Sequence, residues 1–90
     1  MYESLRSALK DAMKARDEVA VAALRSAITS LDNAAAAEAA LPAVEQEADV
    51  RDVIGREIAE RRSAAHTYDG LGRADTAARL RAEADVLAAF

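Results

Sequence analysis

Alanine accounts for 25 of the 90 residues, against one proline and three glycines, and this excess limits the folds that the chain can adopt. Alanine has the highest intrinsic helix propensity and is depleted in strands, so the composition favours helices over a sheet. Only 22 larger apolar side chains, of Val, Leu, Ile, Met, Phe and Tyr, remain to build a core. We therefore expect one small all-α domain.

The absence of cysteine and the single histidine exclude several kinds of site. No disulfide can form, and a structural zinc site or a di-iron centre built on Glu-x-x-His pairs lacks its ligands. The formal net charge of −4 also argues against a general nucleic-acid binder, whose affinity depends on an excess of Lys and Arg. We expect no metal and no cofactor.

No stretch of the chain approaches the roughly 18 uninterrupted apolar residues that would indicate a membrane span. The first six residues, Met-Tyr-Glu-Ser-Leu-Arg, also lack the apolar run of an export signal. The sequence therefore predicts a cytoplasmic protein with no membrane span.

Apolar residues recur every three or four positions, which predicts a small bundle of three main helices plus a C-terminal fourth. The first helix should close at Arg16, and Asp17 is the expected N-cap of the second, which the alanine run at 34–37 could extend. Leu41-Pro42 is the strongest break, because the residue before a proline is pushed out of helical dihedrals. The third helix should begin near Asp49.

Glycines at 70 and 72 predict the end of the third helix, and the fourth should run from about residue 73 or 75 to the end of the chain. Neighbouring helices are expected to be antiparallel and joined by short loops, except across residues 32–48. Residues 32–50 hold five acidic residues and no Lys or Arg, whereas residues 1–16 and 51–81 each carry a net charge of +2. A modest basic surface is therefore expected on an acidic protein.

The expected third helix carries charges inside its apolar stripe. At about 100° per residue, Glu57 and Arg61 fall within the arc that Val50 and Ile54 occupy. Charges there are costly unless paired, and the i,i+4 spacing lets these two pair. Arg25, at the rim of the second helix's stripe, could reach the same carboxylate. The pattern predicts either a structural ion-pair network of Arg25, Glu57 and Arg61 or a polar patch that receives a ligand.

Candidate catalytic groups are few. Ser63 and His66 are three residues apart on a helix, but no strained turn presents the serine and no oxyanion-hole segment is visible. Glu57 and Glu60 are paired carboxylates by spacing alone, with no pocket pattern beside them. The glycines at 70–72 are too few for a phosphate-binding loop. We assign no catalytic residue and expect a protein that is not an enzyme.

A series of short segments follows one order along nearly the whole chain. They are Leu5 to Arg16, Leu24-Arg25, Ala27-Ile28, Val53-Ile54, Arg56-Glu57-Ile58, Glu60-Arg61-Arg62, Tyr68, Gly72-Arg73, Asp75, Ala77, Ala82-Glu83 and Val86-Leu87. With these segments the chain resembles the GatB/YqeY family. The most specific part is the segment that runs from the expected third helix through Gly72-Arg73-x-Asp75.

The resemblance implies an all-helical subdomain similar to the tail of the B subunit of the glutamine-dependent aspartyl/glutamyl-tRNA amidotransferase. That tail contacts tRNA, and the amide transfer takes place in other domains. The family usually continues into a second helical subdomain, whereas we expect here a single subdomain of residues 1–90 that ends at Phe90. The chain also has Ala59 and Leu80 where the family commonly has Lys and an acidic residue.

Two functions are compatible with these observations. The first is a non-catalytic binding module for tRNA or an amidotransferase partner, and its candidate contact residues are Arg6, Lys10, Lys14, Arg56, Arg62 and Arg73. The first three recur one turn apart on one helix flank, a spacing that suits a phosphate backbone but also an ordinary solvated face. The second is a protein-interaction module that binds a partner or a second copy and has no RNA role, since a thin core would gain from burial between chains.

Overall fold

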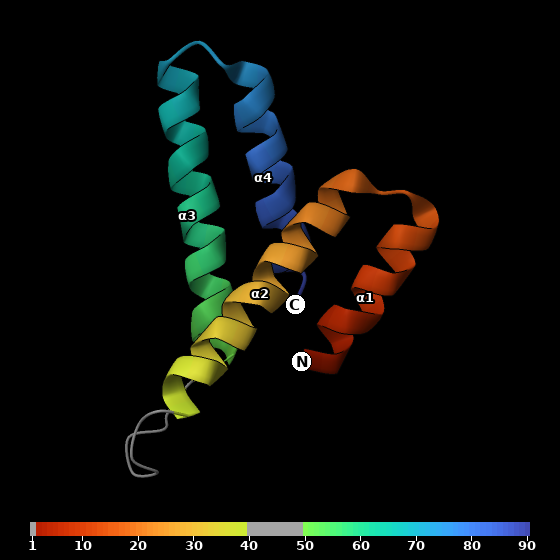
Figure 1. The fold of residues 1–90 in the computed structure, drawn as a ribbon. Coiled ribbons are helices and arrows are strands. Elements are labelled where there is room, and N and C mark those ends of the chain that lie inside the picture. Colours follow the sequence, from red (N-terminus) through yellow and green to blue (C-terminus); the bar gives the residue numbers. More distant parts are fainter. Residues whose placement is uncertain (1, 40–49) are drawn as a thin grey trace.

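The computed structural model describes residues 2–39 and 50–90, and within these ranges all regular structure is helical (Figure 1). The four helices are α1 (Tyr2–Ala15), α2 (Glu18–Ala39), α3 (Val50–Gly70) and α4 (Ala74–Ala88). The predicted all-α bundle, with three main helices and a C-terminal fourth, is confirmed.

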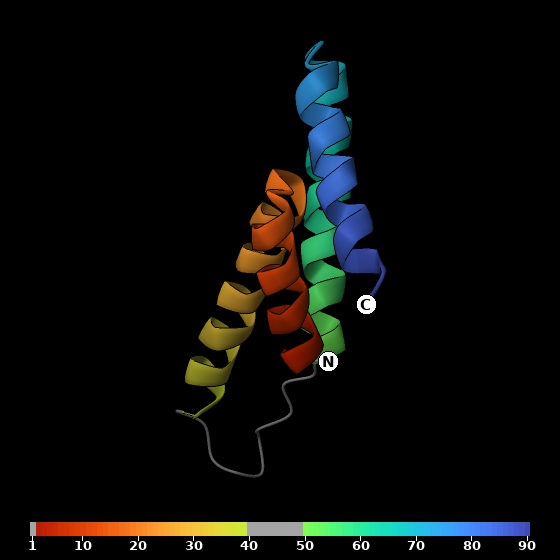
Figure 2. The same ribbon diagram turned by 90° about the vertical axis from the view of Figure 1, so that its right-hand side faces the viewer.

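The helices form two antiparallel hairpins, α1–α2 and α3–α4, and α2 packs against each of the other three helices. The outer half of the α3–α4 hairpin extends past the end of α2, so that this part is only two helices thick (Figures 1 and 2). The radius of gyration is accordingly 14.5 Å, against about 12 Å for a compact domain of this length. The fold is therefore elongated, and much of each helix faces solvent.

Leucine and alanine make most of the core. The largest fully buried side chains are Leu5 from α1, Leu24 from α2 and Leu87 from α4. Five alanines in the described residues have no exposed area: Ala23, Ala27, Ala65, Ala77 and Ala84. Because an alanine side chain is a single methyl group, these positions let the helix backbones approach closely, and the alanine-rich composition thus explains how so few large side chains fill the core.

The helix α1 ends in a left-handed residue that is an arginine, where glycine is the most common residue. Arg16 adopts a left-handed conformation, with φ of 56°. Its amide donates to the Met13 carbonyl at 3.2 Å, and the next amide, of Asp17, donates to the Ala12 carbonyl at 3.0 Å. These two bonds define a Schellman cap, in which the left-handed position is most often glycine. The Asp17 Oδ1 atom then accepts the amide of Ala20 at 3.1 Å, which confirms Asp17 as the N-cap of α2.

The α3–α4 turn repeats the same cap with the expected residue. Gly72 has φ of 74°, and its amide donates to the Asp69 carbonyl at 3.1 Å. The Arg73 amide donates to the Tyr68 carbonyl at 2.8 Å. The glycine signal in the sequence therefore located the end of α3 correctly, whereas no glycine marks the end of α1.

Residues 32–39 belong to α2 and are helical. The expected extension of the second helix through the alanine run at 34–37 is therefore confirmed, and the first eight residues of the expected 32–48 connection are part of this helix, because alanine favours its continuation. Asp32 is held by this helix near the start of α1, where the Tyr2 hydroxyl donates to its carboxylate. The predicted break at Leu41-Pro42 and the predicted start at Asp49 lie outside the described residues.

Candidate functional site

The charged residues within the α3 stripe form a buried polar cluster between α2 and α3. Glu57 is only 7% exposed. Its Oε1 atom accepts hydrogen bonds from the hydroxyls of Ser26 and Ser30, both at 2.9 Å. Its Oε2 atom accepts a bond from Arg61 Nη1 at 3.2 Å. Both carboxylate oxygens are thus paired, which offsets the cost of removing the charge from water.

Arg61 extends the cluster to α4. Its Nε donates to Glu83 Oε1 at 3.2 Å, and Arg79 Nε donates to the other oxygen of Glu83 at 3.4 Å. Glu83 is 9% exposed, so a single guanidinium lies between two buried carboxylates from different helices. No buried side-chain nitrogen or oxygen in the described part of the chain lacks a partner. The cluster satisfies itself and joins three helices.

Arg25, which the sequence analysis placed in this network, lies outside it. Its side chain is exposed, and no hydrogen bond joins it to Glu57 among the described residues. The helix α2 turns Ser26 and Ser30 towards α3, and Arg25 lies about 100° around the axis from Ser26. Ser26, Ser30 and Glu83 were not predicted. The two serines lie about 140–180° around α2 from the apolar stripe that the sequence indicates for this helix, so its periodicity gives no signal for them.

A small cavity of about 160 Å³ opens beside Glu57 and is lined by Ser30, Ala34, Val53, Arg56, Glu57 and Glu60. Pockets for small molecules usually have about 300–1,000 Å³. This cavity is therefore too small for most substrates, and its Glu57 carboxylate is already occupied by protein donors. The second reading of the charged stripe, as a polar patch for a ligand, gains no support from this geometry.

The three basic residues on the flank of α1 differ in whether their charge is paired within the protein. Arg6 is anchored, because its guanidinium lies 4.6 Å from the centre of the Tyr2 ring and 4.0 Å from Asp32 Oδ1. Lys10 and Lys14 are exposed, and neither pairs with a carboxylate of the described residues. These two lysines are therefore the part of the flank whose charge is open to a ligand.

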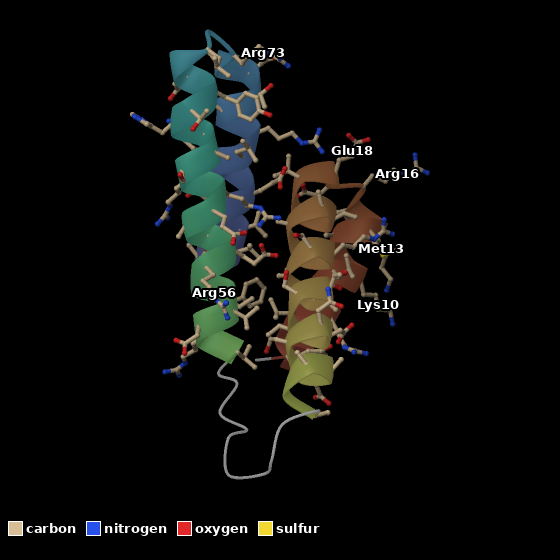
Figure 3. The ribbon with its side chains drawn as sticks, turned by 60° about the vertical axis from the view of Figure 1, so that its left-hand side comes forward. Lys10, Met13, Arg16, Glu18, Arg56 and Arg73 are labelled. Carbon is tan, nitrogen blue, oxygen red and sulfur yellow. The ribbon has the colours of Figure 1, made fainter. Side chains whose placement is uncertain are left out.

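The other candidate contacts lie elsewhere on the molecule. Arg56 and Arg62 are exposed on α3, and Arg73 is the N-cap residue of α4, at the tip of the α3–α4 hairpin. Arg73 lies 6.0 Å from the centre of the Tyr68 ring. Figure 3 places Lys10 and Arg56 on opposite sides of the molecule, with Arg73 at one end. The six candidates consequently do not form one continuous surface.

The residues considered for catalysis or metal binding do not form a site among the described residues. Ser63 and His66 are both exposed on α3, and no hydrogen bond joins their side chains. Within residues 2–39 and 50–90, no three His, Cys, Asp or Glu side chains come together in a group that could hold a metal ion. Among the same residues, no helix combines the length and apolar character that crossing a bilayer requires.

The pair between Asp69 and Arg81 gives a testable pH effect. A hydrogen bond from Arg81 holds the pKa of the exposed Asp69 carboxyl below its usual range. A lowered pKa stabilises the fold above the pKa of the unfolded chain, and this contribution disappears as the pH falls through the folded pKa. We expect Arg81→Gln to raise the Asp69 pKa towards its ordinary value in a carbon-detected NMR titration. Arg62→Gln should leave the Asp69 pKa unchanged, and an unshifted Asp69 in Arg81→Gln would contradict the pairing.

These features define a class: a small all-helical module with a self-satisfied buried ion-pair cluster and exposed basic groups on separate faces. The chain belongs to the YqeY family, because the family model described as Yqey-like protein matches residues 2–90. This match confirms the resemblance noted in the sequence. Comparisons with curated proteins and with solved structures give no match.

Proposed function

We propose that this YqeY-family protein is a non-catalytic helical module that associates with tRNA in the cytoplasm, as the resemblance to the amidotransferase tail suggests. The family membership supports a small helical binding domain. The polar cluster is the one group of buried charged side chains in the described chain, and its hydrogen bonds are internal. A role in holding a partner is therefore better supported than a role in converting a substrate.

The observation that carries the RNA proposal is the open charge of Lys10 and Lys14. They lie one turn apart on α1, are exposed, and have no carboxylate partner among the described residues. Phosphate contacts are made by such lysines, and their energy comes largely from the release of counterions. Arg6 contributes less to this surface, because Tyr2 and Asp32 already engage its guanidinium.

Fluorescence anisotropy with end-labelled tRNA tests the proposal, at low salt and again at physiological salt. We expect binding at low salt that weakens as salt rises, with a slope of log K against log salt of about −2 to −3 for two or three phosphate contacts. Folding of each sample is verified by circular dichroism. Absence of binding at both salt concentrations would overturn the proposal.

A pair of double variants locates the surface. Lys10→Gln with Lys14→Gln should reduce the slope by about 2 if both lysines contact phosphates. Arg56→Gln with Arg62→Gln is the matched control on α3, where we expect a slope close to that of the wild type. The opposite result would move the RNA surface to α3.

A second candidate is a protein-interaction or self-associating module with no RNA role. Three large apolar side chains are exposed in the described residues: Met13 (51%), Leu71 (68%) and Phe90 (38%). Phe90 also lines a groove between α3 and α4 together with Ile54, Ile58 and Leu87. Sedimentation equilibrium separates the two functions, since a mass above the 9.5 kDa of one chain together with no RNA binding would favour this candidate.

A further inference from the structure

The left-handed conformation of Arg16 is costly for an arginine. Its side-chain Cβ atom meets the following carbonyl in this region, and glycine avoids the contact because it has no Cβ. The same cap at the other hairpin uses Gly72, at φ of 74°. A glycine could therefore form the same helix cap at residue 16. The backbone conformation does not explain why this position has an arginine.

Contacts within the fold do not supply that explanation. The Arg16 side chain is exposed, and among the described residues no carboxylate or carbonyl accepts a hydrogen bond from its guanidinium. Lys14 already provides a basic residue in the last turn of α1, where cations suit the negative end of the helix. Arg16 extends from the α1–α2 turn into solvent, clear of the helices (Figure 3).

Both lysines and acidic residues are exposed near Arg16 in the chain. Lys10, Met13 and Lys14 lie within about 100° of one another around α1, and Asp11 lies about 160° from Met13 and about 60° from Lys14. Met13 lies about 60° from Lys10 around the helix and is 51% exposed. Figure 3 shows Lys10, Met13 and Arg16 along the same edge of the molecule.

Two acidic residues follow Arg16 in the sequence. One accepts a hydrogen bond, and the other lies at the positive end of a helix dipole. The Asp17 carboxylate accepts the amide of Ala20. Glu18 lies in the first turn of α2, where the positive end of the helix compensates a negative side chain. Three cations with open charge thus remain at the end of α1, namely Lys10, Lys14 and Arg16.

We propose that Arg16 is an RNA-contact residue, and that Lys10, Lys14 and Arg16 together form a patch that binds successive phosphates of an RNA backbone. The inference rests on the proposed function and adds to it a residue that the basic stripe on α1 did not include. Charge complementarity favours a phosphate backbone as the occupant, because Lys10 and Arg16 lie along one exposed edge (Figure 3) and Lys14 lies one turn after Lys10 on the same helix. The strained turn keeps the third cation beyond the last turn of the helix, where glycine would leave no charge.

Substitution of Arg16 separates binding from folding. Arg16→Gly removes both the strain and the guanidinium, so we expect the Tm to rise by about 4 °C. In the tRNA anisotropy assay we expect affinity at low salt to fall about fivefold and the salt slope to decrease by about 1. A residue with only a structural role would change the Tm and leave the slope unchanged.

Two further variants control for the shape of the turn. Arg16→Asn also removes the charge, tolerates the left-handed conformation better than arginine, and is less flexible than glycine, so it should lower the slope as Arg16→Gly does. Arg16→Lys keeps the charge and the strain, and should leave the Tm and the slope near the wild-type values. Wild-type affinity and slope in Arg16→Gly and Arg16→Asn would overturn the inference and leave the proposed function intact.

Failure of the proposed function has a different signature. If the wild-type protein binds no tRNA at either salt concentration, both the function and the Arg16 inference are overturned. If the wild type binds an acidic protein and Arg16→Gly abolishes that binding while RNA does not bind, the patch serves a protein partner and the RNA inference is wrong.

Discussion

Arg61→Leu is expected to lower the free energy of unfolding by about 3–5 kcal/mol, the range for a buried ion pair that loses one partner. The variant leaves Glu57 and Glu83 without their shared guanidinium at 7% and 9% exposure. The two serine hydroxyls still bond Glu57, and Arg79 still pairs with Glu83, but neither replaces the positive charge between the carboxylates. A domain of this length has about 4–13 kcal/mol of stability, so the variant would lose a large share of it.

Urea unfolding followed by circular dichroism measures this effect. Arg62→Leu is the matched control, because it removes an arginine from the next position of α3, which is exposed, and should change the stability by no more than about 0.5 kcal/mol. A combined Glu57→Gln, Arg61→Met and Glu83→Gln variant removes all three charges and should recover most of the loss. A loss below about 1 kcal/mol in Arg61→Leu would contradict a structural role for the cluster.

Leu24→Ala is expected to cost about 3–5 kcal/mol, because it removes a large side chain from the centre of a thin core. Leu24 is 1% exposed on α2, the helix that packs against the other three. The surrounding helices meet through alanines, whose short side chains have little freedom to move into the space that is left. The cavity should therefore persist.

The matched control for this variant is Leu71→Ala, which makes the same chemical change at a side chain that is 68% exposed. We expect a change within about 0.5 kcal/mol for Leu71→Ala in the same urea titration. Equal losses in the two variants would show that the core is not centred on α2.

Local patterns in the sequence were sufficient for the helices and for one part of the polar cluster. The pair of Glu57 and Arg61 follows from i,i+4 spacing on a single helix, and the structure contains it at 3.2 Å. The partners from other helices could not be predicted in this way. Ser26, Ser30 and Glu83 reach the cluster only through the relative rotation of α2, α3 and α4, which no single-helix pattern determines.

The same distinction applies to the basic residues. Their exposure follows from polar positions on amphipathic helices, and all six candidates are exposed. Their grouping depends on how the two hairpins are placed, and this placement separates Lys10 from Arg56. The turn at Arg16 was not predicted either, because the sequence offers no glycine or asparagine at the end of α1 to indicate a left-handed residue.

The proposed function places an RNA-binding surface at the end of α1. The most direct test is an NMR titration of the ¹⁵N-labelled protein with unlabelled tRNA at low salt, which reports every amide in one experiment. We predict that the signals of Lys10, Lys14 and Arg16 are attenuated first, while those around Glu57 are unaffected at the same ratio. An unchanged spectrum, or changes confined to α3 and α4, would contradict the account.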